Sequence, residues 1–414
     1  MGIRKRQAAV ALVGGACALL VAACSSSAPS AGGGSTSGAA AATKSVLICN
    51  VTDLTGLQQP LASTEDAGGL AAVNIINAAG GIKSLGGAKL TVQKFDTQSS
   101  PDQGVTQATK AVAAGCKAIF GGEITDTVLA ATPVSHRAGV PWVDVGGSGD
   151  EVHERGFNNV FQLQTTTAFA TSYYDMMVAA ASALGIAHPT VGLSVSDTTY
   201  GQDFYSIWSG LNAKGPFNVV SNVSYPLSTT DFSSVAARMV SAHPDFLFNM
   251  GYPSDGIALG RLLKQTFHTT AKEFFSTAQA SATVPQLGAL ADGQLFDSNS
   301  PPVSDPQVQK FSQVYQSIAK TAPTLQASQG YTAVMFIAAA LEKAGSTDGA
   351  AITSALHSVT LTAANGNIYS NPMTFNSSGT LANSPWSWQQ DQNGKLPFVY
   401  PPNLKQAGVI PYSG

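Results

Sequence analysis

The sequence predicts an α/β protein with a doubly wound parallel sheet, followed by a second α/β lobe of the same kind. From Lys44 onward, short apolar runs alternate with segments of helical periodicity, which is the pattern of parallel strands joined by crossover helices. The alternation restarts after a long helical segment at Thr166–Leu184. In both halves the apolar runs stop at small, polar loops, and ligands of parallel sheets bind at such strand ends.

The first half has elements with recognisable ends. They are a strand at 45–51, a helix that ends at Ala78, a strand at 89–95 and a helix that starts at Ser100. Ser63 with Asp66 makes a capping pair for the first helix, and Gly80-Gly81 ends it. The order Ser100-Pro101-Asp102-Gln103 is typical of a helix start, with serine as N-cap and proline in the first turn.

The stretch from Lys117 to Gly149 predicts a strand, a helix and a second strand, each strand followed by a loop with paired glycines. The helix begins at one of three candidate N-caps, Thr125, Asp126 or Thr127. Thr125 and Ser148 lie at two successive strand ends, where hydroxyls and free backbone N–H groups can cradle a small anion. Taken singly, Thr125 is better explained as a helix cap and Ser148 as a turn residue. Together they favour a ligand site.

The second half repeats the alternation. Its strands are predicted at 190–196, 217–225 and 246–250, with helices at 166–184 and 231–242. Tyr200 and Tyr252 lie in the loops that follow two of these strands. Later helices are predicted at 305–320 and 327–343, and late strands at 366–375 and 386–391, with Asn393-Gly394 as a hairpin turn.

The N-terminal residues predict export and lipidation. Arg4-Lys5-Arg6 precedes an apolar run, 8–23, that is too short to span a membrane but suits a signal peptide. The run ends in Leu20-Val21-Ala22-Ala23-Cys24, which resembles a bacterial lipobox and implies cleavage of residues 1–23 and lipidation of Cys24. Residues 24–43 then form a flexible tether with a reach on the order of 25 Å. An uncleaved anchor is the alternative, and both place the folded part outside the cytoplasmic membrane.

Composition and motifs argue against nucleic-acid binding, metal binding and catalysis. Without the three basic residues of the leader, 18 basic side chains face 24 acidic ones, so no affinity for phosphate backbones is expected. The six histidines lack metal-ligand spacing, and no glycine-rich turn completes a nucleotide-binding motif, so we expect neither metal nor cofactor. Gly146-Gly147-Ser148-Gly149 is no nucleophile elbow, because Asp150 stands where the last glycine would be. An enzyme remains only as a site assembled from distant residues.

Cys49 and Cys116 have two alternative states. The compartment favours a disulfide. However, Cys49 falls inside a predicted strand and Cys116 precedes another, and neighbouring parallel strands rarely bring sulfurs into bonding geometry. A disulfide and two buried free thiols therefore both remain open.

An ordered set of short motifs resembles the leucine/isoleucine/valine-binding family of substrate-binding proteins. The motifs are Asp53-Leu54-Thr55-Gly56, the segment 73–82, Ala138-Gly139-Val140-Pro141, Thr199-Tyr200-Gly201, Thr230-Asp231-Phe232-Ser233, Pro244-Asp245-Phe246 and the helix 331–345. The resemblance implies a type I periplasmic-binding-protein fold, in which a three-crossover hinge joins two lobes and the ligand lies between them. The lobes would be 44–165 plus 301–381, and 166–300 plus 382–414. An ABC permease is the implied partner and a monomer the implied state.

The resemblance also implies roles for individual residues. Thr125, Gly146 and Ser148 match positions that hold a ligand carboxylate through backbone amides and hydroxyls. Tyr200 and Tyr252 match positions on the second lobe that close over the ligand, although a lone tyrosine is more often ordinary packing.

One position departs from the family. Where members place an acid against the ligand's ammonium, this chain has Gln279, a neutral amide that does not neutralise a charge. Either another acid, such as Asp126 or Asp255, supplies the counter-charge, or the ligand is not an α-amino acid. An amino acid, or a related small carboxylate or amide, is therefore the expected ligand class. A ligand-sensing receptor component of the same fold is the alternative function, less favoured because no membrane helix or signalling domain follows.

Overall fold

The computed structural model describes residues 45–298, 305–369, 371–382, 386–400 and 405–410, without the side chains of 276–282 and 298. Residues 1–44, with the predicted signal peptide, Cys24 and the tether, lie outside this description. No helix in the described ranges is both long enough and apolar enough to cross a membrane.

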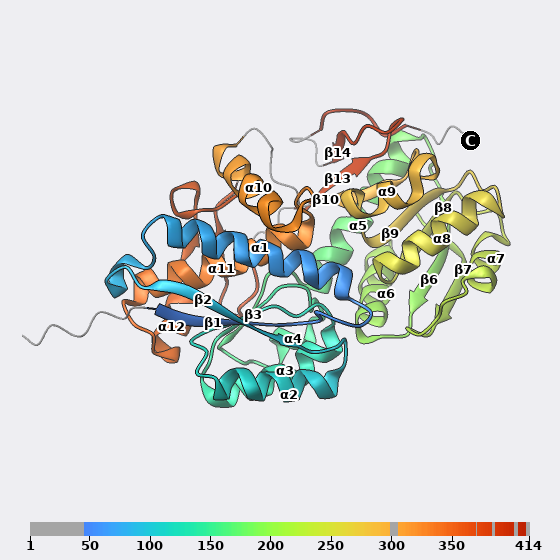
Figure 1. Ribbon diagram of the computed structural model, residues 1–414. Helices are drawn as coiled ribbons and strands as arrows, with labels where there is room; N and C mark the ends of the chain where they lie inside the picture. The colour runs from blue at the N-terminus through green and yellow to red at the C-terminus, as the bar shows by residue number, and fades with distance from the viewer. Residues whose placement is uncertain (1–44, 299–304, 370, 383–385, 401–404, 411–414) are drawn as a thin grey trace, which may run out of the picture. The chain divides into compact units, whose positions relative to one another are not determined.

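The first sheet has five parallel strands in the order β2-β1-β3-β4-β5, of which Figure 1 labels β2, β1 and β3. The strands are β1 (Ser45–Thr52), β2 (Lys89–Asp96), β3 (Ile119–Phe120), β4 (Trp142–Asp144) and β5 (Val160–Gln162). The helices and 3-10 turns joining them are α1 (Gln59–Ala78), η1 (Lys83–Leu85), α2 (Pro101–Ala113), α3 (Thr125–Ala138) and α4 (Glu151–Glu154). The central position of β1 and the right-handed crossovers typical of such units give a doubly wound arrangement.

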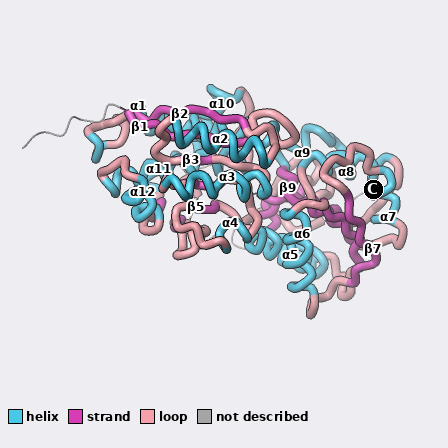
Figure 2. Tube along the Cα trace, turned by 90° about the horizontal axis from the view of Figure 1, so that it is seen from below, coloured by secondary structure: helices cyan, strands magenta, loops and turns pink. Residues whose placement is uncertain are grey.

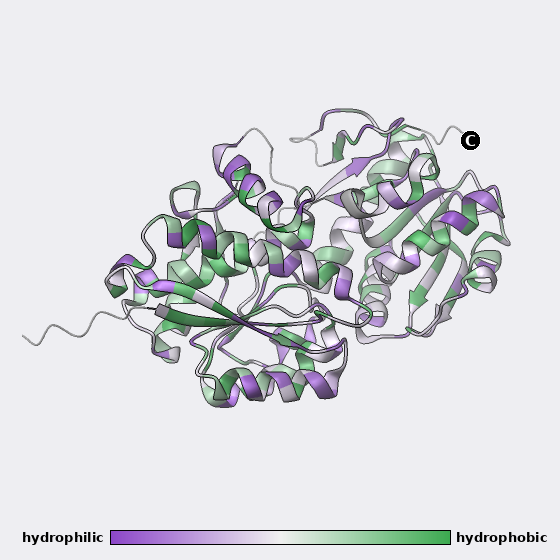
Figure 3. Ribbon diagram, in the orientation of Figure 1, coloured by the Kyte–Doolittle hydropathy of each residue, from purple (hydrophilic) through white to green (hydrophobic). Residues whose placement is uncertain are grey.

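Helices cover both faces of this sheet because its side chains alternate between two hydrophobic clusters. Phe120 packs in a cluster with α1, while its neighbour Ile119 packs in another with α2 and α3. Figure 2 shows α2 and α3 side by side on one face. In Figure 3, α2 carries both hydrophobic and hydrophilic colour, as expected for a helix with one buried side.

The second sheet has seven strands in the order β14-β13-β10-β9-β8-β6-β7. Its strands are β6 (Thr190–Ser196), β7 (Asn218–Tyr225), β8 (Phe246–Met250), β9 (Lys272–Gln279), β10 (Leu295–Ser298), β13 (Ser387–Gln390) and β14 (Phe398–Tyr400). The helices α5 (Thr166–Ala183), α6 (Thr199–Asn212), α7 (Ser233–Val240), α8 (Pro253–Gln265) and α9 (Ala280–Leu287) and the 3-10 turn η2 (Gly288–Ala291) belong to the same half. Pairing is parallel from β10 to β7, and β13 and β14 add an antiparallel edge whose hairpin turn is at Asn393-Gly394, as predicted.

The chain passes between the two sheets three times, after β5, after β10 and before β13. After the second passage come α10 (Pro306–Ala319), α11 (Leu325–Ala344), α12 (Gly349–Leu356), β11 (Thr360–Leu361), η3 (Ala363–Asn365) and β12 (Met373–Thr374). Side chains of all three helices pack in the cluster of α1 and the first sheet. The fold class is therefore the two-lobed α/β arrangement expected from the sequence.

Helix α1 packs closely against α11. A Cβ on Gly330 of α11 would lie 2.2 Å from the carbonyl oxygen of Glu65 on α1, and one on Gly68 would lie 1.9 Å from that of Ala327. Only glycine allows such an approach of two backbones. The contact holds Glu65 of α1 and the start of α11 in fixed positions.

The first predicted helix and one predicted late strand differ from the structure. The first helix begins at Gln59 rather than beside Ser63, because Pro60 occupies its first turn, and Asp66 is a buried residue that accepts hydrogen bonds from Asn50 and Lys94. The late strand predicted at 366–375 shrinks to β12, because Gly366 has a φ of 96° and ends η3.

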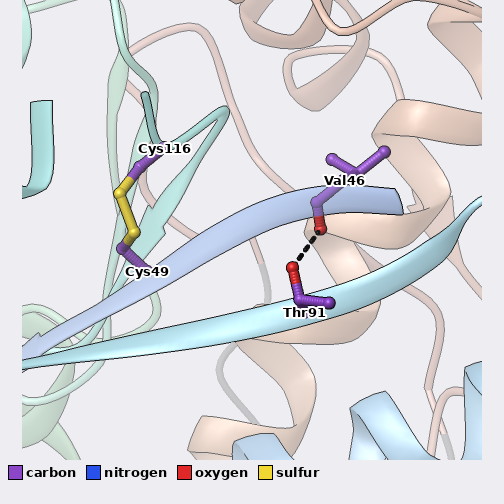
Figure 4. The surroundings of a disulfide bond; sticks show 4 residues. All are labelled: Val46, Cys49, Thr91 and Cys116. Carbon is purple, nitrogen blue, oxygen red and sulfur yellow. Dashed lines mark hydrogen bonds between the residues drawn. A yellow bond between two sulfur atoms is a disulfide. The ribbon is translucent and has the colours of Figure 1, made fainter. Parts of the chain in front are cut away.

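A disulfide joins Cys49 and Cys116 (Figure 4). Cys49 lies within β1, whereas Cys116 lies in the loop just before β3, so the two are not partners on paired strands. Their Cα atoms are 5.8 Å apart, within the range that disulfides need. On the other edge of β1, Thr91 of β2 donates a 3.4 Å hydrogen bond to the carbonyl oxygen of Val46. Of the two alternatives for the cysteines, the structure has the disulfide.

Candidate functional site

Five of the residues singled out in the sequence line one small cavity. They are Thr125, Gly146, Ser148, Tyr200 and Tyr252. The other lining residues are Leu61, Glu123, Gln164 and Gln326. Residues from the carboxyl ends of β3 and β4 thus face residues that follow β6 and β8 of the second sheet. This is the position in which ligands of open parallel sheets bind.

Thr125 is the first residue of α3, and its side chain bridges two loops. The residue before the helix is Ile124, so none of the three predicted N-caps acts as one. The Thr125 hydroxyl instead accepts a 3.1 Å hydrogen bond from the backbone N–H of Gly149, in the loop after β4. Its own proton is still available as a donor toward the cavity.

Ser148 and Gly146 form the β4 side of the cavity. Thr166 donates to the Ser148 carbonyl oxygen through its backbone N–H at 2.6 Å and through its hydroxyl at 2.9 Å. These bonds fix the Ser148 backbone and leave its hydroxyl as a donor. A Cβ on Gly146 would lie 2.4 Å from Oε2 of Glu123, so this position admits no side chain.

The two tyrosines form the opposite wall. Tyr200 is the second residue of α6, whose N-cap Thr198 accepts a hydrogen bond from the N–H of Gly201. Tyr252 directly precedes α8, and its backbone N–H donates to Asp255 at 3.1 Å. The two rings lie 5.7 Å apart between centroids and both are almost fully buried. They offer apolar area and phenol oxygens to whatever the cavity holds.

The candidate counter-charges named from the sequence lie outside this cavity's lining. Asp126 accepts a 2.5 Å hydrogen bond from the hydroxyl of Thr199 at the start of α6. Asp255 accepts a 2.8 Å hydrogen bond from the Tyr225 hydroxyl. The backbone of Gln279 ends β9, but its side chain is outside the described part of the structure.

Glu123 is the acid among the described lining residues, and it was not among the site residues predicted from the sequence. It follows Gly121-Gly122 at the end of β3, two positions before Thr125, and is 6% exposed. Its carboxyl group hydrogen bonds with that of Glu65 on α1. An acid in an otherwise uncharged strand-end loop was the signal available in the sequence.

Further carboxyl groups lie near Glu123 on the side of the first sheet. Glu65 accepts a 2.7 Å hydrogen bond from the Thr52 hydroxyl, and burial raises its pKa to about 8. Burial first, and the neighbouring Glu65 second, raise the pKa of Glu123 well above its usual range. Burial also raises the pKa values of Asp53 and Asp144. Among the described residues no such group of acids, histidines and cysteines has the arrangement of a metal site.

The cavity is too small for an amino acid in the present arrangement. Its volume is about 20 Å³, which holds little more than one water molecule. A larger hollow of about 720 Å³ lies between α1, α10 and α11, away from the strand ends. Its floor is aliphatic, with Ile75 and Met335, and its rim carries Lys83 and Lys310.

Comparison with known proteins shows the same fold and sequence pattern elsewhere. The family model for periplasmic binding proteins matches residues 45–384. The chain is 30% identical over 203 residues to Leu/Ile/Val-binding protein homolog 8 of Brucella abortus (strain 2308), covering 48% of this chain and 49% of that protein. In this match the chain spans about half the length of its relative. It is 27% identical to homolog 3 of Brucella melitensis biotype 1, over 74% of this chain and 82% of that protein.

Solved structures share the fold at lower identity. One is the substrate-binding protein of a branched-chain amino acid transporter from Streptococcus pneumoniae, in complex with isoleucine, with a TM-score of 0.73 and 19% identity. That alignment covers 86% of this chain and all of the other. Another is a solute-binding protein from Rhodopseudomonas palustris BisB5 in complex with 3,4-dihydroxybenzoic acid, with a TM-score of 0.73, 18% identity and coverage of 85% and 95%.

Proposed function

We propose, since this chain belongs to the periplasmic binding protein family, that it captures a small polar ligand between its two lobes and delivers it to an ABC importer. The proposed ligand is an amino acid or a related small carboxylate or amide. Fold neighbours that hold isoleucine and dihydroxybenzoic acid support this range of ligands.

The observation that carries the proposal is the composition of the small cavity. One wall offers the hydroxyls of Thr125 and Ser148 and the N-terminus of α3, whose first N–H groups lack partners within the helix. The other wall offers Tyr200 and Tyr252. Hydroxyls and helix N–H groups bind a carboxylate or an amide oxygen, and the rings exclude water from it.

Opening of the lobes is part of the proposed mechanism. Because the cavity admits little more than a water molecule, a ligand enters only when the tyrosines move away from Thr125 and Ser148. The three passages of the chain between the sheets are the natural hinge. In this scheme Thr125 and Ser148 hold the ligand first, and Tyr200 and Tyr252 close over it.

The remaining parts of the proposal concern location and boundaries. Lobe 1 comprises 44–165 and 301–381, and lobe 2 comprises 166–300 and 382–414. Cleavage after residue 23 and lipidation of Cys24 would hold this monomer at the outer face of the cell membrane, beside its permease.

A ligand screen followed by calorimetry tests the function. Thermal shifts with amino acids, small amides and aromatic acids identify ligands, because a ligand that binds only the folded state raises its stability. Ser148→Ala should then weaken the best ligand about tenfold or more, which corresponds to about 1.4 kcal/mol. Ser354→Ala, on an exposed position of α12, is the matched control and should bind like wild type. Wild-type affinity in both Ser148→Ala and Tyr200→Ala would contradict the proposed site.

A further inference from the structure

The charges around the small cavity narrow the ligand class, an inference that rests on the function proposed above. Among the described residues, those that line the cavity include no lysine or arginine, and Glu123 supplies the carboxyl group. A ligand with only a carboxylate would bring a negative charge to a buried acid without any cation to offset it. Burial of an uncompensated charge is costly.

Glu123 is placed to contact a ligand. It is 6% exposed, its carboxyl group reaches the cavity beside Gly146, and its Oε1 atom has no partner apart from the contact with the Glu65 carboxyl group. The carboxyl group of Glu65 also accepts a hydrogen bond from the Thr52 hydroxyl. Two carboxyl groups in contact share a proton, since both cannot be ionised at close range.

Three further carboxyl groups lie near the pair, on separate elements. Asp53 follows β1, Asp66 is next to Glu65 on α1, and Asp144 ends β4. Lys94 forms an ion pair of 2.5 Å with Asp66, and the positive charge of Arg155 interacts with the carboxyl group of Asp144. Tyr200 and Tyr252, the titratable groups of the opposite wall, carry no positive charge in any state. The cavity is therefore suited to a ligand that carries a cationic group, and unsuited to a ligand whose only charge is negative.

We propose that Glu123 is the acid that contacts a cationic nitrogen of the ligand, and that Glu123 holds the proton it shares with Glu65 when the cavity contains no cation. The ligand then carries both a carboxylate or carbonyl, held by Thr125 and Ser148, and an ammonium group, held by Glu123. Glu123, an acid on the first lobe, thus supplies the negative charge that the neutral Gln279 lacks.

Binding by this route releases a proton. The protonated carboxyl group of the pair gives its proton to the buffer as the ammonium group arrives, and a carboxylate–ammonium contact replaces the carboxyl–carboxyl contact. Because burial raises the pKa of Glu65 to about 8, the pair still holds a proton at pH 7. Affinity for amine ligands should therefore increase as the pH rises from 6 to 8.

Matched pairs of ligands with and without the amine test the proposal on the full chain. Titration calorimetry compares leucine with 4-methylpentanoate and phenylalanine with 3-phenylpropanoate, in buffers of different ionisation enthalpy at pH 7. Wild type should bind the amine member of a pair at least tenfold tighter and release a fraction of a proton. Glu123→Gln should lose at least tenfold for the amine member, change little for the deaminated one and release no proton. Glu154→Gln, an exposed acid on α4, is the control and should match wild type.

Several results would overturn the inference. They are a wild-type preference for the deaminated acids, equal weakening of both members by Glu123→Gln, and binding of leucine or phenylalanine without proton release. If Glu123→Gln does not fold, Glu65→Gln replaces it, and amine binding by that variant with unchanged proton release would equally overturn it. Binding of deaminated acids alone would contradict the role of Glu123 and remain consistent with the proposed function. A folded wild type that binds no amino acid, amide or small acid would contradict both the role of Glu123 and the proposed function.

Discussion

The buried pair Glu65 and Glu123 should make the folded protein less stable as the pH rises. Burial raises the pKa of Glu65 from 4.5 to about 8, so between these values the folded state keeps a proton that the unfolded state has lost. Stability falls with increasing pH wherever the folded state binds more protons. The slope for one such group is about 1.36 kcal/mol per pH unit. From pH 5.5 to 7.5 the free energy of unfolding should therefore drop by about 2–3 kcal/mol.

Glu65→Gln isolates this contribution because glutamine has the same shape and does not titrate. Urea unfolding at pH 5.5 and 7.5 should show a clearly smaller loss in Glu65→Gln than in wild type. The pKa of Glu273 and that of Asp297 are also raised to about 7 by burial, so part of the slope should remain. Glu154→Gln should keep the wild-type slope. A wild type that is equally stable at both pH values, or a Glu65→Gln variant with an unchanged slope, would show that the folded protein does not hold a proton at this pair.

Three other perturbations test the packing, the disulfide and the location. Gly330→Ala should lower the free energy of unfolding by about 1–3 kcal/mol in urea titrations, because its Cβ would meet the α1 backbone. Gly210→Ala, whose Cβ would meet nothing within 4 Å, is the control and should not destabilise the protein. Equal effects of the two changes would contradict the close packing of α1 on α11. Cys49→Ser combined with Cys116→Ser should lower the free energy of unfolding by about 2–5 kcal/mol, since the disulfide closes a separation of 67 residues. A reductant should lower the melting temperature of the wild type and not that of the double variant. A protein whose stability responds to neither change would argue against a disulfide in solution. Cys24→Ala should move the protein from membranes to the soluble fraction or leave a precursor, and wild-type fractionation would contradict lipidation.

The sequence predicted elements whose ends are marked by local residues. The apolar runs that stop at Gly121-Gly122 and Gly146-Gly147 became strand ends beside a common cavity, and 190–196 and 246–250 are the bounds of β6 and β8. Helix starts were harder to predict, because Ser63 and Asp66 match a capping pattern while Pro60 decides the first turn.

What the sequence could not give depends on contacts between distant residues. Glu65 and Glu123 are 58 positions apart, and their contact requires α1 to pack tightly on α11 and β1 to lie beside β3. By their positions in the sequence, Asp126 and Asp255 were equally plausible partners for a ligand ammonium group. In the folded chain their carboxylates instead accept hydrogen bonds from Thr199 and Tyr225. The disulfide likewise depends on the loop before β3 passing the middle of β1.

A crystal structure of the full chain with the best ligand from the screen would show directly where the ligand binds. We expect ligand density between Thr125 and Ser148 on one side and Tyr200 and Tyr252 on the other, in a cavity larger than the present 20 Å³. A ligand nitrogen should lie within hydrogen-bond distance of Glu123. Density in the hollow between α1 and α11 instead, with the strand-end cavity unchanged, would contradict this expectation.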